Sequence, residues 1–297
     1  MSGTDQDAAG FEFESAAEVE RLLRGAGYLP DRKIATVVHL AGRLAKPVLV
    51  EGPAGTGKTE LAKSVAAMTG ARLIRLQCYE GMDEAKALYE WDYRKQLLAI
   101  ARSGDGAGPE GGLFGAEFLL SRPLLEAIRA ADPVVLLVDE VDRLDVEAEA
   151  LLFEVLSDYQ VSIPELGTVS ARQVPLVFLT SNGSRELSEA LRRRCLYLHI
   201  DYPEAERERD IVLARVPGIA ENLATRLAHV IRSLRALDLR KKPSVSETLD
   251  WARTLLVLGV EGVGEIDRAL VAETMPVLLK NQADIELALK KLGDLAP

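Results

Sequence analysis

Short apolar runs alternate with stretches of helical periodicity over the first two thirds of the chain. The clearest run is Val134–Val138, five apolar residues in succession, which is typical of a central strand buried on both faces. Strands that alternate with helices favour a parallel sheet covered by the connecting helices. We therefore predict an α/β fold with strands at Val48–Val50, Arg72–Gln77, Val134–Val138, Leu176–Thr180 and Leu196–Ile200.

Apolar residues at helical spacing predict helices around these strands. Ser15–Arg24 begins with Ser15 as N-cap and has Glu18 three residues later, which is the pattern of a capping box. Asp31 can cap a second helix that ends at Leu44. Further helices are expected from Thr59 onwards and over Tyr79–Arg102, Arg122–Ala131 and Val146–Tyr159.

Three stretches interrupt this alternation. Gly104–Gly112 predicts a flexible loop by its glycine content, and we interpret it as an insertion rather than a domain boundary. Leu113–Leu120 fits either a small hairpin or a helix, and Val161–Pro175 predicts a hairpin inserted before the next strand. The aromatic cluster Tyr89–Tyr93 is unusual, and its sequence assigns it no role.

Beyond a hinge at Tyr202-Pro203 the pattern is entirely helical. Helices are predicted at Glu204–Val216, Ile219–Leu234, Ser244–Leu258, Glu265–Leu279 and Gln282–Leu292. We expect a flexible tail over residues 1–14, an α/β domain over 15–203 and a small all-α lid domain over 204–297.

The composition is that of an ordinary soluble globular protein, with 48% hydrophobic and 28% charged residues. No apolar run is long enough to cross a bilayer, and the first residues lack the pattern of a signal peptide, so a cytoplasmic protein without a membrane partner is expected. The net charge of −10 argues against nucleic acid as a general partner. Cys78 and Cys195 are too few for a disulfide scaffold, and both are expected to be small core residues.

The stretch between the first strand and its helix carries the clearest chemistry. Gly52-x-x-x-x-Gly57-Lys58-Thr59 matches the P-loop pattern and lies between a strand and a helix, as that motif requires. Its glycines let backbone N–H groups turn towards phosphate oxygens, Lys58 can reach the β- and γ-phosphates, and Thr59 can bind magnesium. We therefore predict binding of ATP with Mg²⁺ by Gly52, Pro53, Ala54, Gly55, Thr56, Gly57, Lys58, Thr59 and Glu60.

Two carboxylates follow the Val134–Val138 strand. Ligands of open parallel sheets bind beyond the carboxyl ends of the strands, so these acids should meet the P-loop in one crevice. Asp139 would hold the magnesium ion, and Glu140 would orient and polarise the attacking water. The alternative is that one of them only caps the helix that begins at Val146.

Two later segments add candidate residues. Asn182 follows the Leu176–Thr180 strand and could bond to the γ-phosphate or to the lytic water, or could be a simple turn residue. Three adjacent arginines, Arg192, Arg193 and Arg194, precede the last strand. One of them could act as an arginine finger, and the alternative is a solvated basic turn.

This ordered set resembles the AAA+ ATPases, with P-loop NTPase fold. Gly52–Thr59 looks like Walker A, Leu136–Glu140 like Walker B, Asn182 like sensor 1 and Arg194 like the arginine finger, with Arg193 as second choice. The insertions at Val161–Ser170 and around Gly104–Leu120 look like the MoxR branch of that superfamily. More narrowly, Glu84–Leu97 and Pro243–Trp251 resemble the CoxD-type accessory ATPases of carbon monoxide dehydrogenase maturation.

The resemblance implies an ATP-driven ring, a homo-hexamer, that remodels or matures a client enzyme. It also implies that the ring works together with a protein that contains a von Willebrand factor A domain. ATP would lie between protomers, with Arg194 supplied by the neighbour of the subunit that holds Lys58 and Glu140. The chain departs from many MoxR relatives in one place, because Val245, Ser246 and Glu247 stand where a sensor 2 arginine is common. Arg240, Lys241 or Lys242 could substitute for it.

Two further functions stay open at this point. The first is a nucleotide-gated binding module, in which the ATP-bound state rather than turnover matters to a partner. The second is an ATPase that acts on DNA, which the acidic charge and the lack of a helix-turn-helix or aromatic-basic stretch argue against.

Overall fold

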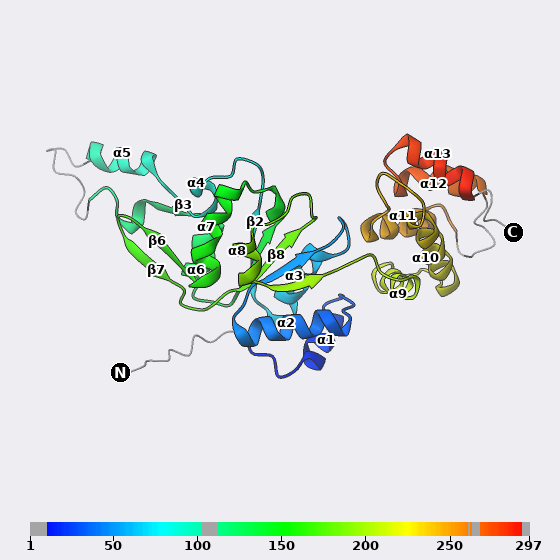
Figure 1. The fold of residues 1–297 in the computed structure, drawn as a ribbon, viewed down its shortest axis with the longest axis horizontal. Helices are drawn as coiled ribbons and strands as arrows, with labels where there is room; N and C mark the ends of the chain where they lie inside the picture. The colour runs from blue at the N-terminus through cyan, green and yellow to red at the C-terminus, as the bar shows by residue number, and fades with distance from the viewer. Residues whose placement is uncertain (1–10, 103–111, 261, 263–267, 293–297) are drawn as a thin grey trace. The chain divides into compact units, whose positions relative to one another are not determined.

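The unbroken apolar run near the middle of the chain forms β5 (Val134–Asp139), in which every residue is buried. It is an inner strand of a five-stranded parallel sheet of order β2-β5-β8-β1-β9 (Figure 1). A strand that is covered on both faces has no solvent-facing side and therefore needs no alternation of polar residues. Burial of each Leu or Val side chain there contributes about 1.5–3 kcal/mol to stability. The predicted parallel α/β sheet is confirmed, with β1 at Val48–Glu51, β2 at Arg72–Gln77, β8 at Leu176–Ser181 and β9 at Leu196–His199.

The computed structural model describes residues 11–102, 112–260, 262 and 268–292. These form two units, one with residues up to Gly52 and Lys58–His199, the other with Pro53–Gly57 and the chain from Ile200 onwards. Each unit has its own apolar core.

Helices cover both faces of the sheet in the first unit. Parallel connections are right-handed, so the connection from β1 to β2 crosses one face, and those from β2 to β5 and from β5 to β8 cross the opposite face. The first connection contains α3 (Lys58–Thr69), which packs on β5, β2 and β8. The others contain α6 (Pro123–Arg129) and α7 (Val146–Ser157). Because the five strands are parallel, their carboxyl ends lie together along one side of the sheet, which we call the carboxyl edge.

Two N-terminal helices pack against each other and begin as expected. In α1 (Ala16–Gly25) the Ser15 side chain accepts a hydrogen bond from Glu18 N, and in α2 (Arg32–Leu44) Asp31 accepts one from Ile34 N at 2.8 Å. The capping box is only half formed, because the Glu18 carboxylate accepts from Glu14 N rather than from Ser15 N. The extended backbone before the helix presents the neighbouring N–H instead.

The single helix predicted over Tyr79–Arg102 is wrong. This stretch forms α4 (Glu84–Ala87), β3 (Tyr89–Trp91) and α5 (Tyr93–Arg102), and β3 pairs antiparallel with β4 (Leu119–Ser121). The aromatic cluster explains the break, because the Trp91 ring is buried and packs edge-on against Tyr89 and Phe114. Leu113–Leu120 contains no hairpin of its own: it forms the three-residue 3₁₀ turn η1 (Ala116–Phe118) and the start of β4, which pairs with β3.

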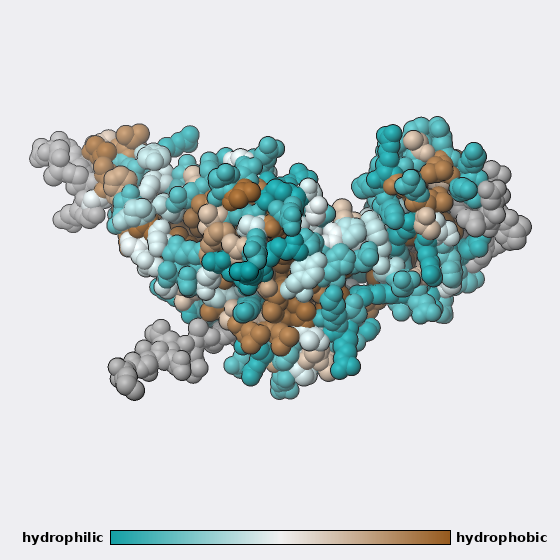
Figure 2. All heavy atoms as spheres, viewed as in Figure 1, coloured by the Kyte–Doolittle hydropathy of each residue, from teal (hydrophilic) through white to brown (hydrophobic). Residues whose placement is uncertain are grey.

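The apolar residues of α5 face outwards. Only Gln96 is buried in this helix, and its amide donates to the Leu113 carbonyl at 2.6 Å. Apolar side chains gather at this end of the first unit in Figure 2, and those exposed on α5 are Tyr93, Leu97, Leu98 and Ile100. The helix thus buries its polar glutamine and exposes its large apolar residues.

The predicted hairpin before β8 is present as β6 (Gln160–Ile163) and β7 (Gly167–Ser170), which lie next to α6. Of the loop predicted over Gly104–Gly112, all but Gly112 lies outside the described residues. Residues 1–10 of the predicted tail also lie outside them.

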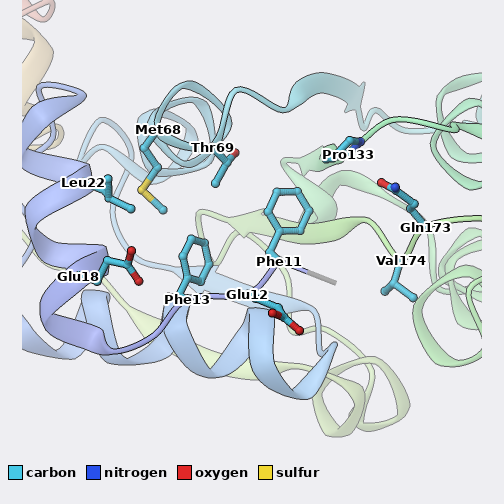
Figure 3. A pocket seen from close by; sticks show the side chains of 10 residues that line it. All are labelled: Phe11, Glu12, Phe13, Glu18, Leu22, Met68, Thr69, Pro133, Gln173 and Val174. Atoms are coloured by element: carbon cyan, nitrogen blue, oxygen red, sulfur yellow. The ribbon is translucent and has the colours of Figure 1, made fainter. Parts of the chain in front are cut away.

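The described part of the predicted tail is not a solvated coil. Phe13 is buried and packs over Gly42 of α2. Phe11 and Phe13 line a cavity of about 290 Å³ at the amino-terminal ends of the strands, together with Glu12, Glu18, Leu22, Met68, Thr69, Pro133, Gln173 and Val174 (Figure 3). Burial of the Phe13 side chain offsets the conformational entropy that is lost when this segment becomes ordered.

The second unit contains the predicted C-terminal helices. They are α9 (Ala205–Arg215), α10 (Glu221–Arg235), α11 (Val245–Val257), α12 (Arg268–Leu278) and α13 (Gln282–Leu292). Ser244 and Glu247 form a complete capping box at the start of α11. No helix in the described part of the chain has both the length and the apolar character to span a bilayer.

A buried ion pair ties three of these helices together. The Glu208 carboxylate of α9 accepts from both terminal nitrogens of Arg235 in α10, and from the hydroxyl of Thr248 in α11 at 2.7 Å. The Arg235 Nε also donates to the Pro243 carbonyl at 2.9 Å. Both charged groups are almost wholly removed from water, so loss of either one would leave the other buried without a counter-charge.

Glu208→Ala should destabilise the second unit by about 3–5 kcal/mol, because it leaves the Arg235 charge buried without a counter-charge. Urea unfolding in a Trp91→Phe background, where Trp251 is the remaining tryptophan, measures this. Glu204→Ala is the matched control, since that carboxylate is 82% exposed and 3.8 Å from Arg232, and should change stability by less than about 1 kcal/mol. Equal losses in both variants would contradict this assignment.

Cys78 should resist thiol reagents in the folded protein. Burial, followed by the negative charges of Asp139, Asp142 and Glu140, raises the pKa of its thiol to about 12. About one thiol in 10⁴ is then ionised at pH 8, and only the thiolate reacts. A Cys195→Ser variant followed with a disulfide reagent should react slowly at pH 8, about tenfold faster per pH unit up to pH 10, and rapidly once unfolded by guanidinium. Rapid reaction of the native variant at pH 8 would contradict the burial of Cys78.

Candidate functional site

The loop between β1 and α3 has the backbone that its glycines permit. Gly55 and Gly57 have φ angles of 74° and 93°, in the left-handed region that residues with a Cβ avoid. The Thr56 hydroxyl donates to the Pro53 carbonyl at 3.0 Å, which closes the turn. Thr56 is buried, Ala54 and Gly55 are exposed, and Pro53 and Glu60 are half-buried.

Lys58 begins α3 and points to the shared strand edge. Its ammonium donates to the Gly52 carbonyl at 2.7 Å and to Asn182 Oδ1 at 2.8 Å. Asn182 follows β8, so the structure brings together two predicted site residues that are 124 positions apart. Burial lowers the pKa of Lys58, and the carboxylates of Asp142, Asp139 and Glu140 act in the opposite direction.

The two predicted magnesium ligands also meet. Thr59 Oγ1 donates to Asp139 Oδ1 at 3.0 Å, and the Asp139 side chain is only 4% exposed. A hydroxyl and a carboxylate oxygen side by side are ligands that suit Mg²⁺, which normally completes its shell with water and phosphate. In the described residues there is no cluster of three or more His, Cys, Asp and Glu side chains that would hold a metal alone. The residues therefore fit a magnesium ion brought with a nucleotide.

Thr180 fixes the two acids relative to each other. Its hydroxyl donates to Asp139 Oδ1 at 2.5 Å and accepts from the Glu140 N–H at 2.9 Å. Glu140 has a φ of 57°, an unusual conformation that costs a non-glycine residue about 1–3 kcal/mol. The turn aims the Glu140 carboxylate at Gln77 Nε2 and Arg143 Nε, each at 2.9 Å. Neither acid caps α7, because the N-cap residue of that helix is Asp145.

A third carboxylate, which the sequence analysis missed, holds the Asn182 turn. Asp142 Oδ2 accepts from Asn182 N at 3.2 Å, and from the N–H and hydroxyl of Ser184 at 2.9 and 2.6 Å. Burial alone would raise the pKa of Asp142, but the bonds from Ser184 and Asn182 outweigh it, and the pKa lies below its usual value. The signal was available as the second aspartate of D-E-V-D.

The three arginines of α8 (Glu189–Arg194) take different partners. Arg194 is half-buried, donates to Ser157 Oγ at 2.5 Å and to the Ala190 carbonyl at 2.8 Å, and stacks on Phe153. Arg193 is 77% exposed and pairs with Glu189 of its own helix. Arg192 lies 3.4 Å from Glu51 at the end of β1. Within one chain, the structure therefore ties Arg194 to α7 rather than to Lys58 or Asp139.

Two further residues of β2 belong to the site. Arg75 donates to Asp139 Oδ2 at 2.5 Å, and Gln77 donates to Glu140. Both stand on one face of the strand, and Gln77 is paired in register with Asp139. The sequence of β2 did not mark Arg75 and Gln77 as site residues, because their contacts arise only from the pairing of β2 with β5.

Comparisons with known proteins identify the family of the chain. Residues 48–202 match the family described as AAA, ATPase family associated with various cellular activities. The protein NorQ of Paracoccus denitrificans is 25% identical over 276 residues, which cover 90% of this chain and 92% of that protein. The denitrification regulatory protein NirQ of Pseudomonas aeruginosa is 25% identical over 237 residues, covering 77% and 80%.

Among solved structures, the RuvB Holliday junction branch migration motor of Thermotoga maritima is similar to this chain. Its TM-score is 0.46 at 18% identity, and the match covers 83% of this chain and 67% of that one.

The family match contains Lys58, Asp139 and Asn182, whose side chains converge at the strand ends. It spans more than half of the 297 residues. The chain therefore belongs to the AAA family of ATPases.

Proposed function

We propose that this ATPase binds ATP with magnesium at the carboxyl edge of the sheet and uses its hydrolysis to remodel or mature a partner protein. The observation that carries the proposal is the meeting of Lys58 with Asn182, and of Thr59 with Asp139, at adjacent strand ends. A phosphate chain needs a cation, inward N–H groups and a metal ligand within a few ångströms of each other. These residues supply that set.

Each side chain has a role that its contacts support. Backbone N–H groups of Gly52–Gly57 and the Lys58 ammonium would bind the phosphates. Thr59 and Asp139 would hold magnesium, which as a Lewis acid draws charge from the phosphoryl oxygens. Asn182, now bonded to Lys58, would turn its amide to the γ-phosphate or the attacking water. Glu140 would orient and polarise that water once released by Gln77 and Arg143.

The remaining charge would come from a second copy in a hexameric ring. Arg194, or Arg193 as second choice, would reach the γ-phosphate in the neighbouring subunit, and a trans arginine is worth roughly 10³–10⁵ in rate in related systems. The position of α8 directly before β9 supports this role, because arginines there stand near the subunit surface. In the described lid, Arg240, Lys241 and Lys242 are exposed and could replace a sensor 2 arginine.

The finer assignment is a MoxR-type ATPase most like the CoxD group. The similarity to NorQ and to the denitrification regulatory protein NirQ, over most of the length of both, supports a protein that acts on a partner protein. We extend this to cofactor assembly in a molybdenum hydroxylase such as carbon monoxide dehydrogenase, together with a von Willebrand factor A domain protein, in the cytoplasm.

The outer face of α5 supports a protein client. Leu97 is 66% exposed, and Leu98, Ile100 and Tyr93 on the same helix are exposed too. Exposure of such a group of apolar side chains to solvent is unfavourable and is typical of a protein interaction site. Arg94 and Arg102 lie two turns apart on this helix, and it contains no carboxylate. The complementary surface is an apolar groove with acidic edges on a partner protein.

The second candidate function is a nucleotide-gated binding module. It is favoured by the bonds that hold the Glu140 carboxylate on Gln77 and Arg143, since in this arrangement the acid is not free to activate water. In such a module the ATP-bound state would act on the partner without turnover.

Glu140→Gln should retain ATP binding and lose turnover by about 10²–10⁴-fold, because the amide cannot polarise the attacking water. Phosphate release and binding of a fluorescent ATP analogue measure the two effects separately. Turnover equal to wild type would remove Glu140 from the role of base.

A mixture of Arg194→Ala and Glu140→Gln subunits separates hydrolysis in trans from the binding module. Each variant alone should be inactive, and mixing should restore activity at interfaces that combine an intact Glu140 with an intact Arg194. The same mixture made with Arg193→Ala decides between the two arginines. No recovery in either mixture, with ATP binding intact, favours the binding module.

A photo-crosslinker at Leu97 should capture a partner in the ATP-bound Glu140→Gln protein and not in nucleotide-free protein. Leu44 on α2 is the matched control, being 55% exposed on another face of the first unit. The crosslinked protein, once identified by mass spectrometry and purified, should raise ATP turnover of the wild type, and Leu97→Ser with Leu98→Ser should abolish that increase. Equal crosslinking at Leu44 would contradict a client face on α5.

A further inference from the structure

The Asp139 carboxylate forms an ion pair with the guanidinium of Arg75. Arg75 Nη2 lies 2.5 Å from Asp139 Oδ2, while Thr59 and Thr180 occupy the other oxygen, Oδ1. An aspartate with 4% of its side chain exposed would be costly without a counter-charge. Arg75 therefore supplies the counter-charge of the Asp139 carboxylate in this structure.

The guanidinium of Arg75 is able to leave. Its side chain is 47% exposed, whereas Asp139 is fixed by two threonine hydroxyls. An arginine with its stem on the surface of a strand reaches water by rotating its side-chain torsions, without moving the backbone. The two partners differ in mobility, and the cation is the one that can move.

A magnesium ion at this place would compete with Arg75 for the Asp139 carboxylate. A magnesium ion held by Thr59 and Asp139 would lie next to the guanidinium, and two cations within a few ångströms repel each other strongly at the effective dielectric of a protein site. Both cannot hold Asp139 with full strength.

We propose that Arg75 is the resident counter-cation of Asp139 and is displaced when magnesium binds with nucleotide, so that Arg75 sets the magnesium affinity of the site. The inference rests on the proposed nucleotide site at Lys58 and deepens it. Arg75 is a positioning residue, because it acts on the metal ligand and not on the reacting phosphate.

The displacement reaches the second acid. Arg75 also donates to Gln77 Oε1, and Gln77 Nε2 donates to Glu140 Oε2 at 2.9 Å. Departure of Arg75 removes one of the bonds that orient the Gln77 amide, which then holds Glu140 less firmly. Arrival of the metal at Asp139 is thereby linked to release of the base.

The test measures metal binding rather than turnover. Binding of N-methylanthraniloyl-ADP is followed by fluorescence, first in EDTA and then over a magnesium titration, for wild type, Arg75→Gln, Arg75→Met and Arg75→Lys. Arg72→Gln is the matched control, since it removes the same charge from the other end of β2, where Arg72 pairs with Glu126. Manganese(II) binding in the presence of ADP, measured by electron paramagnetic resonance, gives a second readout.

Arg75→Gln and Arg75→Met should reach half-saturation at about fivefold lower magnesium or less, because the competing charge is gone. Arg75→Lys and Arg72→Gln should stay within about twofold of wild type, since the first keeps the charge and the second lies far from Asp139. Nucleotide affinity in EDTA should be similar in all five proteins.

Two results overturn the inference alone: an unchanged magnesium midpoint in both neutral variants, or a higher one, in each case with normal nucleotide binding in EDTA. Failure of wild type to bind the nucleotide at all would overturn the proposed site and this inference with it.

Discussion

The structure of the site depends on one constraint, the burial of the Asp139 carboxylate at the end of the central strand. A charge in that position must be surrounded by donors, and each donor comes from a different part of the fold. Thr59 comes from the helix after β1, Thr180 from β8 and Arg75 from β2. The hydrogen bonds to this one side chain thus draw together the elements that carry Lys58, Glu140 and Asn182.

Much of this could be predicted from the sequence because two rules act at once. Apolar runs fix where the strands lie, and parallel strands end at one edge, so polar residues just after Val138 and Thr180 had to meet the P-loop. The contacts of Lys58 with Asn182 and of Thr59 with Asp139 follow from that geometry. Neither required knowledge of side-chain conformation.

What could not be predicted depends on tertiary neighbours. Tyr79–Arg102 has helix-compatible spacing, yet Tyr89–Trp91 becomes a strand because β4 offers it a partner more than two dozen residues later. Asp142, Arg75 and Gln77 were missed for a related reason, since their partners lie on, or just after, strands that are adjacent in space and remote in sequence. Local periodicity carries no information on register between strands.

The charges of the site explain why its arrangement is stable and yet easily changed. Asp139, Glu140 and Asp142 bring three negative charges, and Lys58, Arg75 and Arg143 bring three positive charges to the same strand edge. At the proposed site, a magnesium–nucleotide complex would add a cation beside Asp139 and anionic phosphates beside Lys58, so the existing ion pairs would have to be exchanged. Lys58 is buried and would gain phosphate partners where it stands. The side chains of Arg75 and Arg143 are 47% and 59% exposed, and each could give up its carboxylate partner to water at low cost. The exposed ion pairs would therefore change first on ligand binding, and the buried contacts would hold the backbone of the site in place.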